Sequence, residues 1–170
     1  MVNSQLEILQ QGRSYLNTIS ESAYNEILPN HFISSAGTHI RHALDHYQAI
    51  MTGLEGKVIN YDHRTRGGDI EKSPDLANKK IAQIIQWLEG LTLTDFERDL
   101  ALSTELSVYD AKVATIPTTL ARELIFASSH AVHHYAMVAQ IAKHQDIRLP
   151  PLFGIAPATA THLRQLEAVS

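Results

Sequence analysis

Apolar residues recur at intervals of three and four in four stretches of the chain, which is the periodicity of amphipathic helices. The predicted helices span residues 4–27, about 34–54, 73–90 and 117–144. Pro29 is expected to end the first helix and Gly90 the third. Small polar residues precede the last three stretches and are suited to cap the backbone N–H groups at a helix start.

The segment between the third and fourth helices has a different pattern. Apolar and polar residues alternate there, with apolar positions at Leu100, Leu102, Leu106 and Val108. This alternation predicts a strand, and residues 111–116 are expected to pair with it across a turn at Tyr109 and Asp110. The result would be a short β-hairpin between helices three and four. A short C-terminal helix is expected from Pro157.

Four long helices in 170 residues predict an all-α fold, most simply a four-helix bundle with long connections that occupies residues 1–170 as one domain. The first connection is short, so the first two helices are expected to be antiparallel neighbours. The other two connections are long, and one of them, residues 56–75, is rich in charge. Connections of that length in compact domains are often functional.

Composition excludes several classes of function. The chain has no cysteine, which removes disulfides, a thiol nucleophile and thiolate metal ligands. The balance of 14 basic and 18 acidic residues gives a net charge of −4 without a basic stripe, which disfavours binding to nucleic acid or to an anionic membrane. The N-terminal residues do not have the pattern of a signal peptide, and no apolar run approaches the roughly 18 residues of a membrane span. A cytoplasmic protein is therefore expected.

Histidine is the outlier of the composition, because six of the ten histidines lie in two short segments. The segments read HIRHALDHY at residues 39–47 and SSHAVHHYAMVAQIA at residues 128–142. At about 100° per residue, His39, His42 and His46 share one narrow stripe of the second helix. His130 and His134 have the i, i+4 spacing with which two imidazoles on one helix face hold one ion.

Two facing stripes of histidine favour a bound divalent ion, because buried imidazole nitrogens without partners cost a few kcal/mol. Either segment alone is a weak signal, since histidine is also an acceptable surface residue. Both together, on or beside the apolar faces of two helices, favour a shared site. His133 is either a neighbour of the ligands or a helix-seam or surface residue. The remaining histidines are expected to be solvated or locally bonded: His31, His63, His144 and His162.

The two histidine segments resemble the DinB-like family, which includes the YfiT-type metal-dependent hydrolases. The resemblance runs from about Leu6 to His144 and extends to the stretches NYDHRTRGGDIE and LPPLFGIAPATA. It implies a four-helix bundle in which three histidines hold a metal. One comes from the second helix in a pattern like H-x-x-D, and two come from the fourth helix in H-x-x-x-H.

For this chain the resemblance implies His42, followed by Asp45, together with His130 and His134 as the metal ligands. The residues themselves leave His39 and His46 as competitors of His42 on the same stripe. Zn²⁺ is the most economical ion for imidazole ligands, and nickel, iron and manganese are also compatible.

Three nitrogen ligands leave a coordination position open, which is typical of catalytic rather than structural sites. The resemblance implies two chemistries, hydrolysis and transfer of a low-molecular-weight thiol such as glutathione or bacillithiol. His46 is a candidate general base, and Asp45 a candidate partner that orients the imidazole of His42. Each also has a purely structural interpretation. Arg64 and Arg66 either bind an anionic small-molecule substrate or belong to a solvated charged loop.

A second class of function uses the same ligands without catalysis: a metal- or small-ligand-binding stress-response protein. A homodimer is compatible with either class. The distinguishing feature is a cleft that reaches the open coordination position, because an enzyme needs one and a storage site does not. A third class, a DNA-binding or repair factor, is disfavoured by the acidic balance.

Overall fold

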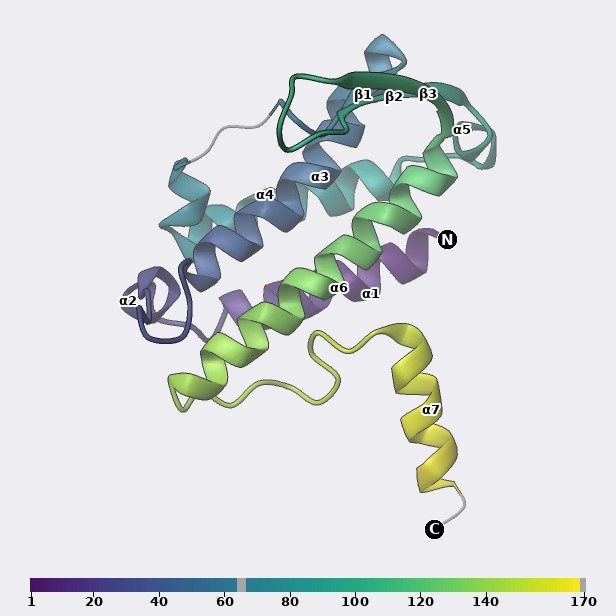
Figure 1. The fold of residues 1–170 in the computed structure, drawn as a ribbon. Helices are drawn as coiled ribbons and strands as arrows, with labels where there is room; N and C mark the ends of the chain where they lie inside the picture. The colour runs from purple at the N-terminus through teal and green to yellow at the C-terminus, as the bar shows by residue number, and fades with distance from the viewer. Residues whose placement is uncertain (64–66, 169–170) are drawn as a thin grey trace.

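The computed structural model describes residues 1–63 and 67–168 and is mostly helical, with a small sheet at one end (Figure 1). The helices are α1 (Val2–Leu16), α2 (Glu21–Asn25), α3 (Ala36–Gly56), α4 (Pro74–Glu89), α5 (Leu93–Phe96), α6 (Leu120–His144) and α7 (Pro157–Glu167), and η1 (Asp69–Glu71) is a 3-10 turn. The strands are β1 (Val58–Asn60), β2 (Asp99–Glu105) and β3 (Val113–Thr119). The predicted helical class is confirmed.

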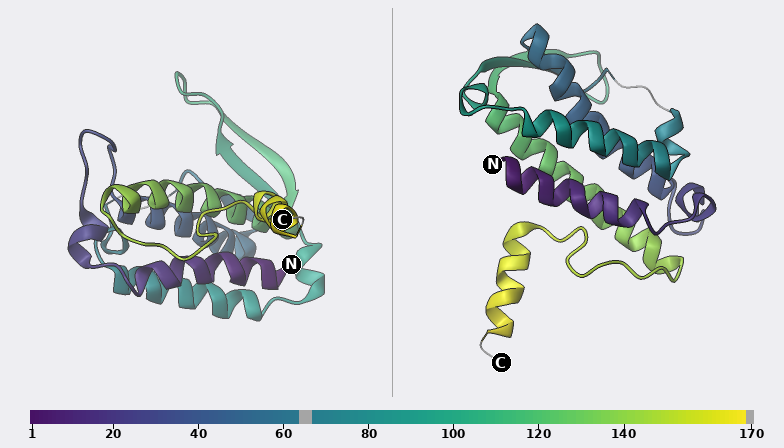
Figure 2. Two further views of the ribbon diagram at one scale, coloured as in Figure 1. Left: turned by 90° about the horizontal axis from the view of Figure 1, so that it is seen from below. Right: turned by 180° about the vertical axis from the view of Figure 1, so that it is seen from behind.

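The four long helices form two layers around one core. α3 packs along α6 and α1 packs along α4, while α3 also contacts α4 and α1 also contacts α6. The view from below shows the α3 and α6 layer above the α1 and α4 layer (Figure 2). Fully buried side chains from all four helices fill the space between them, among them Leu9, Ile40, Tyr47, Ile81, Leu124 and Val138.

The prediction that the first two long helices are neighbours is wrong. α1 packs mainly against α4 and α6, so α1 and α3 occupy diagonal positions. The reason is the segment between them, which contains α2 and crosses the end of the two layers (Figure 1). Across the diagonal, the buried Tyr47 hydroxyl of α3 donates a hydrogen bond of 2.9 Å to Oε1 of Gln5 on α1.

The prediction of one helix over residues 4–27 is also wrong, because α1 ends at Leu16. The Thr18 hydroxyl donates to the carbonyl of Tyr15 at 2.9 Å, and the Ser20 side chain accepts from the N–H of Ala23 at 3.2 Å. Such local bonds from hydroxyl side chains compete with the helical ladder. The first ends α1 and the second starts α2.

Side-chain caps set the starts of the two helices that carry the histidines. Ser35 accepts from the N–H of Thr38 at the start of α3, and Thr119 accepts from the N–H of Arg122 at the start of α6. The second helix is predicted to start at about residue 34, and this is confirmed, because α3 begins at Ala36. The fourth helix begins three residues later than the predicted Pro117, because Pro117 is paired with β2 as part of β3.

The predicted β-hairpin is confirmed. β2 and β3 are antiparallel, with Leu102 opposite Ile116. β1 joins β2 in parallel and completes the sheet in the order β1-β2-β3, although three residues are too few to show an alternating pattern in the sequence. The C-terminal helix α7 also begins at the predicted Pro157. Within residues 1–63 and 67–168, no helix is long and apolar enough to cross a membrane.

Gly53 on α3 provides a test of how closely α3 packs on β1. A Cβ atom at Gly53 would lie 2.6 Å from the carbonyl oxygen of Val58 and 2.7 Å from the Cα of Ile59, and both are backbone atoms. Gly53→Ala is therefore expected to destabilise the fold by about 1–3 kcal/mol, as overpacking does. Gly56→Ala is the matched control, since a Cβ there meets nothing within 4 Å. Denaturant unfolding of both variants measures the difference, and equal stabilities would contradict the close packing.

Candidate metal centre

The interface of α3 and α6 brings the two histidine segments together. The ring of His42 lies 4.8 Å from that of His46 and 5.0 Å from that of His130, and the rings of His46 and His130 are 4.0 Å apart. One ring nitrogen from each of these three residues lies within 4.8 Å of the other two. Among the described residues, this is the group of three metal-ligating side chains that is close enough to share an ion.

His134 and His39 extend the cluster on one side. Nε2 of His134 lies 3.0 Å from Nε2 of His130, and its Nδ1 lies 2.9 Å from Nδ1 of His39. The ring of His134 also contacts the ring of His42 edge-on at 4.6 Å. A neutral imidazole has one N–H and one lone pair, so His134 donates at one nitrogen and accepts at the other. Nε2 of His39 in turn lies 3.0 Å from the hydroxyl of Ser34.

Burial keeps His134 and His39 neutral. It lowers the pKa of His134 to about 2, and the imidazoles of His130, His42, His39 and His133 lower it further. Burial also lowers the pKa of His39, with a smaller contribution from His133. Both side chains are therefore neutral at physiological pH. Neutral imidazoles present lone pairs, the form in which histidine binds a metal.

The backbone fixes the tautomer of His46. Its Nδ1 lies 3.0 Å from the carbonyl oxygen of His42, which can only accept, so Nδ1 carries the proton and Nε2 carries the lone pair. The side chain is only 6% exposed, and its ring stacks on Tyr61 at 4.8 Å and tilts against Phe126 at 5.7 Å. A histidine whose second nitrogen donates to a carbonyl is oriented as metal-binding histidines commonly are.

Tyr61 and Glu123 flank the cluster and were not identified from the sequence. The Tyr61 hydroxyl donates to Oε2 of Glu123 at 2.5 Å, and burial and this carboxylate raise the pKa of Tyr61. Glu123 is 0% exposed and also accepts from Thr118 at 2.5 Å and from Arg122 at 2.8 Å. A tyrosine in a loop and an acidic residue in the first turn of a helix have no spacing that indicates a site, so only the fold reveals the pair.

Asp45 forms an ion pair within α3. Its Oδ2 accepts from Arg41 at 2.6 Å, and Nε of Arg41 donates to Glu71 at 3.0 Å. The expected role of Asp45 as a partner of His42 stays a prediction. Asp45 and Arg41 line a cavity of about 930 Å³ between α3, β1 and the loop that follows it, on the flank of α3 away from the histidine stripe.

The structure places the remaining histidines as follows. His133 is exposed beside His134, with the two rings 5.3 Å apart. His31 and His144 stack on each other at 4.2 Å, away from the cluster, which agrees with their expected local bonding. Arg64 and Arg66 lie outside the described residues.

The histidines of the cluster differ in exposure. His46 and His134 are buried, His42 and His130 are half-buried, and His133 is exposed. The donor set consists of imidazole nitrogens alone, which suits zinc, nickel, copper or iron more than magnesium or calcium. The residues present therefore fit a transition-metal ion.

Comparison with known proteins gives two further findings. No family model matches the chain. The chain is 31% identical over 108 residues to FK506-binding protein 5 of Rhizopus delemar, a match that covers 64% of this chain and 28% of that protein. The chain thus spans little more than a quarter of the length of this curated relative.

Two solved structures share the fold. The DinB-like protein YjoA of Bacillus subtilis superposes with a TM-score of 0.64 at 17% identity, over 89% of this chain and 96% of that chain. A DinB-like protein of Bacillus cereus gives 0.57 at 13% identity, over 86% and 91%. The resemblance noted in the sequence is confirmed at the level of the fold.

Tyr61→Phe tests whether the pair of Tyr61 and Glu123 supports this side of the centre. The change removes one of the hydrogen bonds to a buried carboxylate, so the free energy of unfolding is expected to fall by about 1.5–3 kcal/mol. Tyr109→Phe is the control, because Tyr109 is exposed at the tip of the hairpin. Unfolding is followed in urea with a chelator present, so that metal does not contribute. A loss no larger than that of the control would show that the hydroxyl adds nothing.

Proposed function

We propose that this chain, which has the fold of the DinB-like proteins, is a metal-dependent enzyme whose α3 and α6 imidazoles hold one divalent ion. The observation that carries the proposal is the convergence of ring nitrogens from His42, His46 and His130 within 4.8 Å. Such an ion, when bound, activates a water molecule or a substrate thiol as a nucleophile at neutral pH. Zinc is the most economical choice, with nickel, iron or manganese as alternatives.

We infer that His42 and His130 are ligands in any arrangement. They belong both to the set implied by the resemblance, with His134, and to the set of converging nitrogens, with His46. The third ligand is therefore His134 or His46. If it is His134, His46 is left beside the ion as the proposed general base, which would accept a proton from the nucleophile.

The four long helices would form a four-helix bundle. In such bundles, metal sites are commonly built from side chains on facing helices. The caps at Ser35 and Thr119 and the packing of α3 on α6 hold the ligands in place before an ion arrives. A preformed set of ligands loses little conformational entropy on binding the metal.

The substrate would be a small molecule. The net charge of −4 disfavours nucleic acid, and we expect the protein to act in the cytoplasm. The chain has no cysteine, so in a transfer reaction the thiol would come from a low-molecular-weight cofactor such as glutathione or bacillithiol. In a hydrolytic reaction the nucleophile would be water instead of a thiol. Asp45 would orient the imidazole of His42 one turn away on α3, while it also forms its ion pair with Arg41.

The second candidate function is a metal- or small-ligand-binding protein without turnover. It would use the same imidazole ligands, but it requires no accessible coordination position. Hydrolytic and thiol-transfer assays of the metal-loaded protein separate the two functions. Stoichiometric metal without turnover in either class of assay would support the second.

Single alanine variants test the ligand set. His42→Ala and His130→Ala are each expected to weaken Zn²⁺ binding by more than about 100-fold, beyond the effect of losing a residue that only supports a ligand. Of His46→Ala and His134→Ala, the variant that lacks the third ligand is expected to lose metal affinity to the same degree. If the third ligand is His134, His46→Ala is expected to keep the metal but lose turnover. Calorimetric titration measures the affinities.

Two controls belong to this experiment. His39→Ala is expected to keep the ion, and His63→Ala, an exposed loop variant, is expected to change nothing. A wild-type protein that takes up no stoichiometric metal from zinc, nickel, iron or manganese would refute the proposal.

Metal removal is expected to lower the melting temperature without unfolding the protein at room temperature. The reason is that the apolar core lies between all four long helices and does not require the ion. If the ion is present at about a thousand times its dissociation constant, binding contributes about 4 kcal/mol. Calorimetry with and without a chelator measures the shift. Complete unfolding by the chelator would identify a structural metal instead of a catalytic one.

A further inference from the structure

The C-terminal helix α7 stands apart from the two layers of long helices (Figures 1 and 2). Its residues are mostly exposed, including Leu163 at 39% and Leu166 at 56%, and Ala160 is its buried position. These three residues lie on one side of the helix at about 100° per residue. A helix of 11 residues is marginal in water by itself, so α7 needs a surface that covers this apolar side.

The segment before α7 directs it away from its own domain. The ring of Phe153 is seated against Tyr15 and Tyr135, with centroids 5.7 and 5.2 Å away. Gly154 has a φ of +69°, and a Cβ there would lie 2.6 Å from the backbone nitrogen of Ala136. Ala156 is extended ahead of Pro157, as the residue before a proline prefers. The chain is thus fixed at Phe153 and Gly154 and leaves outward.

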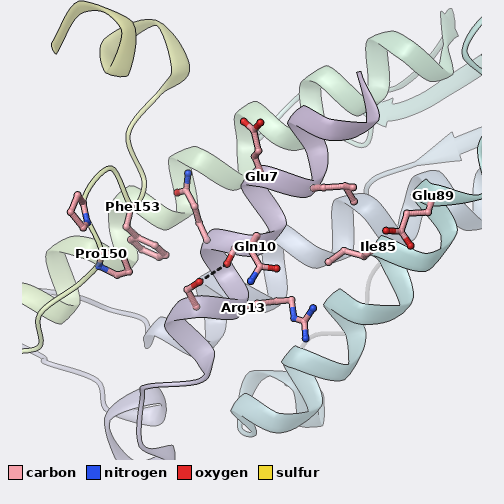
Figure 3. Close-up of a pocket in the computed structure, with 11 residues that line it drawn as sticks. Glu7, Gln10, Arg13, Ile85, Glu89, Pro150 and Phe153 are labelled. Carbon is pink, nitrogen blue, oxygen red and sulfur yellow. Dashed lines mark hydrogen bonds between the residues drawn. The ribbon is translucent and has the colours of Figure 1, made fainter. Parts of the chain in front are cut away.

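A groove of about 570 Å³ lies at the point from which the tail departs, between α1, α4 and the tail itself (Figure 3). Leu6, Ile85 and Phe153 provide its apolar part. Its charged residues are Glu7 and Glu89 toward one end and Arg13 toward the other (Figure 3). In the part of the chain described, no ion pair joins these three charges to other side chains.

The charges of α7 complement those of the groove. Arg164 and Glu167 are one turn apart on α7, next to the apolar side that carries Leu163. With Leu163 seated on the apolar part of the groove, Arg164 would face its acidic end. Exposed ion pairs add little energy, but they set the orientation in which a helix docks.

We propose that the groove receives α7 from a second copy of this chain, so that two copies exchange their C-terminal helices. The second copy is the occupant because each α7 is directed away from its own groove. An exchange of this kind uses the same two surfaces twice, and a two-fold axis closes the assembly as a dimer. This inference is independent of the metal centre.

The absence of cysteine allows a clean cross-linking test. Protein with Leu163→Cys is mixed with differently tagged protein carrying Ile85→Cys, and the mixture is oxidised. A disulfide between the two different chains is expected. Gln165→Cys replaces Leu163→Cys in the control, because Gln165 lies about 160° away around α7 and should cross-link far less.

Two outcomes overturn the proposal. If one chain carrying both Leu163→Cys and Ile85→Cys closes an internal disulfide while the mixture forms none, α7 occupies its own groove. If neither sample cross-links above the control and the wild-type chain sediments as a monomer, the groove does not bind α7 at all.

Sedimentation gives an independent measure. Leu163→Asp is expected to raise the dissociation constant of the dimer by at least about tenfold, as the loss of a buried leucine implies, while Gln165→Glu leaves it unchanged. Arg164→Glu should weaken the dimer, and Glu7→Lys with Glu89→Lys in the same chain should restore it. Unchanged helical content excludes unfolding as the cause. A dimer insensitive to Leu163→Asp would overturn the proposal.

Discussion

The packing of α3 against α6 is the constraint on which the rest of this structure depends. It places the imidazoles of two helices face to face, with the rings of His46 and His130 4.0 Å apart, and it removes most of the water that would otherwise solvate them. A buried polar nitrogen without a partner is costly. The N–H of His46 is directed at the carbonyl oxygen of His42, so the other ring nitrogen of His46 presents a lone pair. A cation placed among these rings would accept several lone pairs at once.

The fold supports this interface from behind and from one end. Behind it, α1 and α4 complete the core, and the bond from Tyr47 to Gln5 joins the two layers. At the end, the sheet brings Tyr61 over the ring of His46 and into contact with Glu123. A carboxylate buried to this degree is tolerated only when donors surround it. Tyr61 is one of those donors, and its ring also stacks on His46. The burial of the Glu123 carboxylate and the position of the His46 ring are therefore linked through Tyr61.

The sequence predicted the features that follow from local periodicity and failed where distant contacts decide. The caps at Ser35 and Ser73, the β2 and β3 hairpin and the pairing of two histidine segments follow from spacing along the chain. The diagonal placement of α1 and α3 does not, because it depends on the path of the segment around α2. Helical spacing also identified the stripe that carries His42 and His46, but it contains no information on where a ring nitrogen points. That depends on a bond such as the one from His46 to the His42 carbonyl.

The surroundings of the two candidate third ligands suit them to different tasks. His46 is enclosed by Tyr61 and Phe126, and its Nδ1 is committed to a backbone carbonyl, so it is held rigidly with one lone pair to offer. His134 instead belongs to a line of close contacts. Those contacts run from Nε2 of His130 through His134 and His39 to the half-buried hydroxyl of Ser34, with each step at 2.9 or 3.0 Å. A rigid imidazole with a fixed tautomer suits metal binding, whereas both ring nitrogens of His134 are engaged by the imidazoles of His130 and His39, which suits His134 to positioning those rings. We infer that His46 is the better placed of the two to bind the ion.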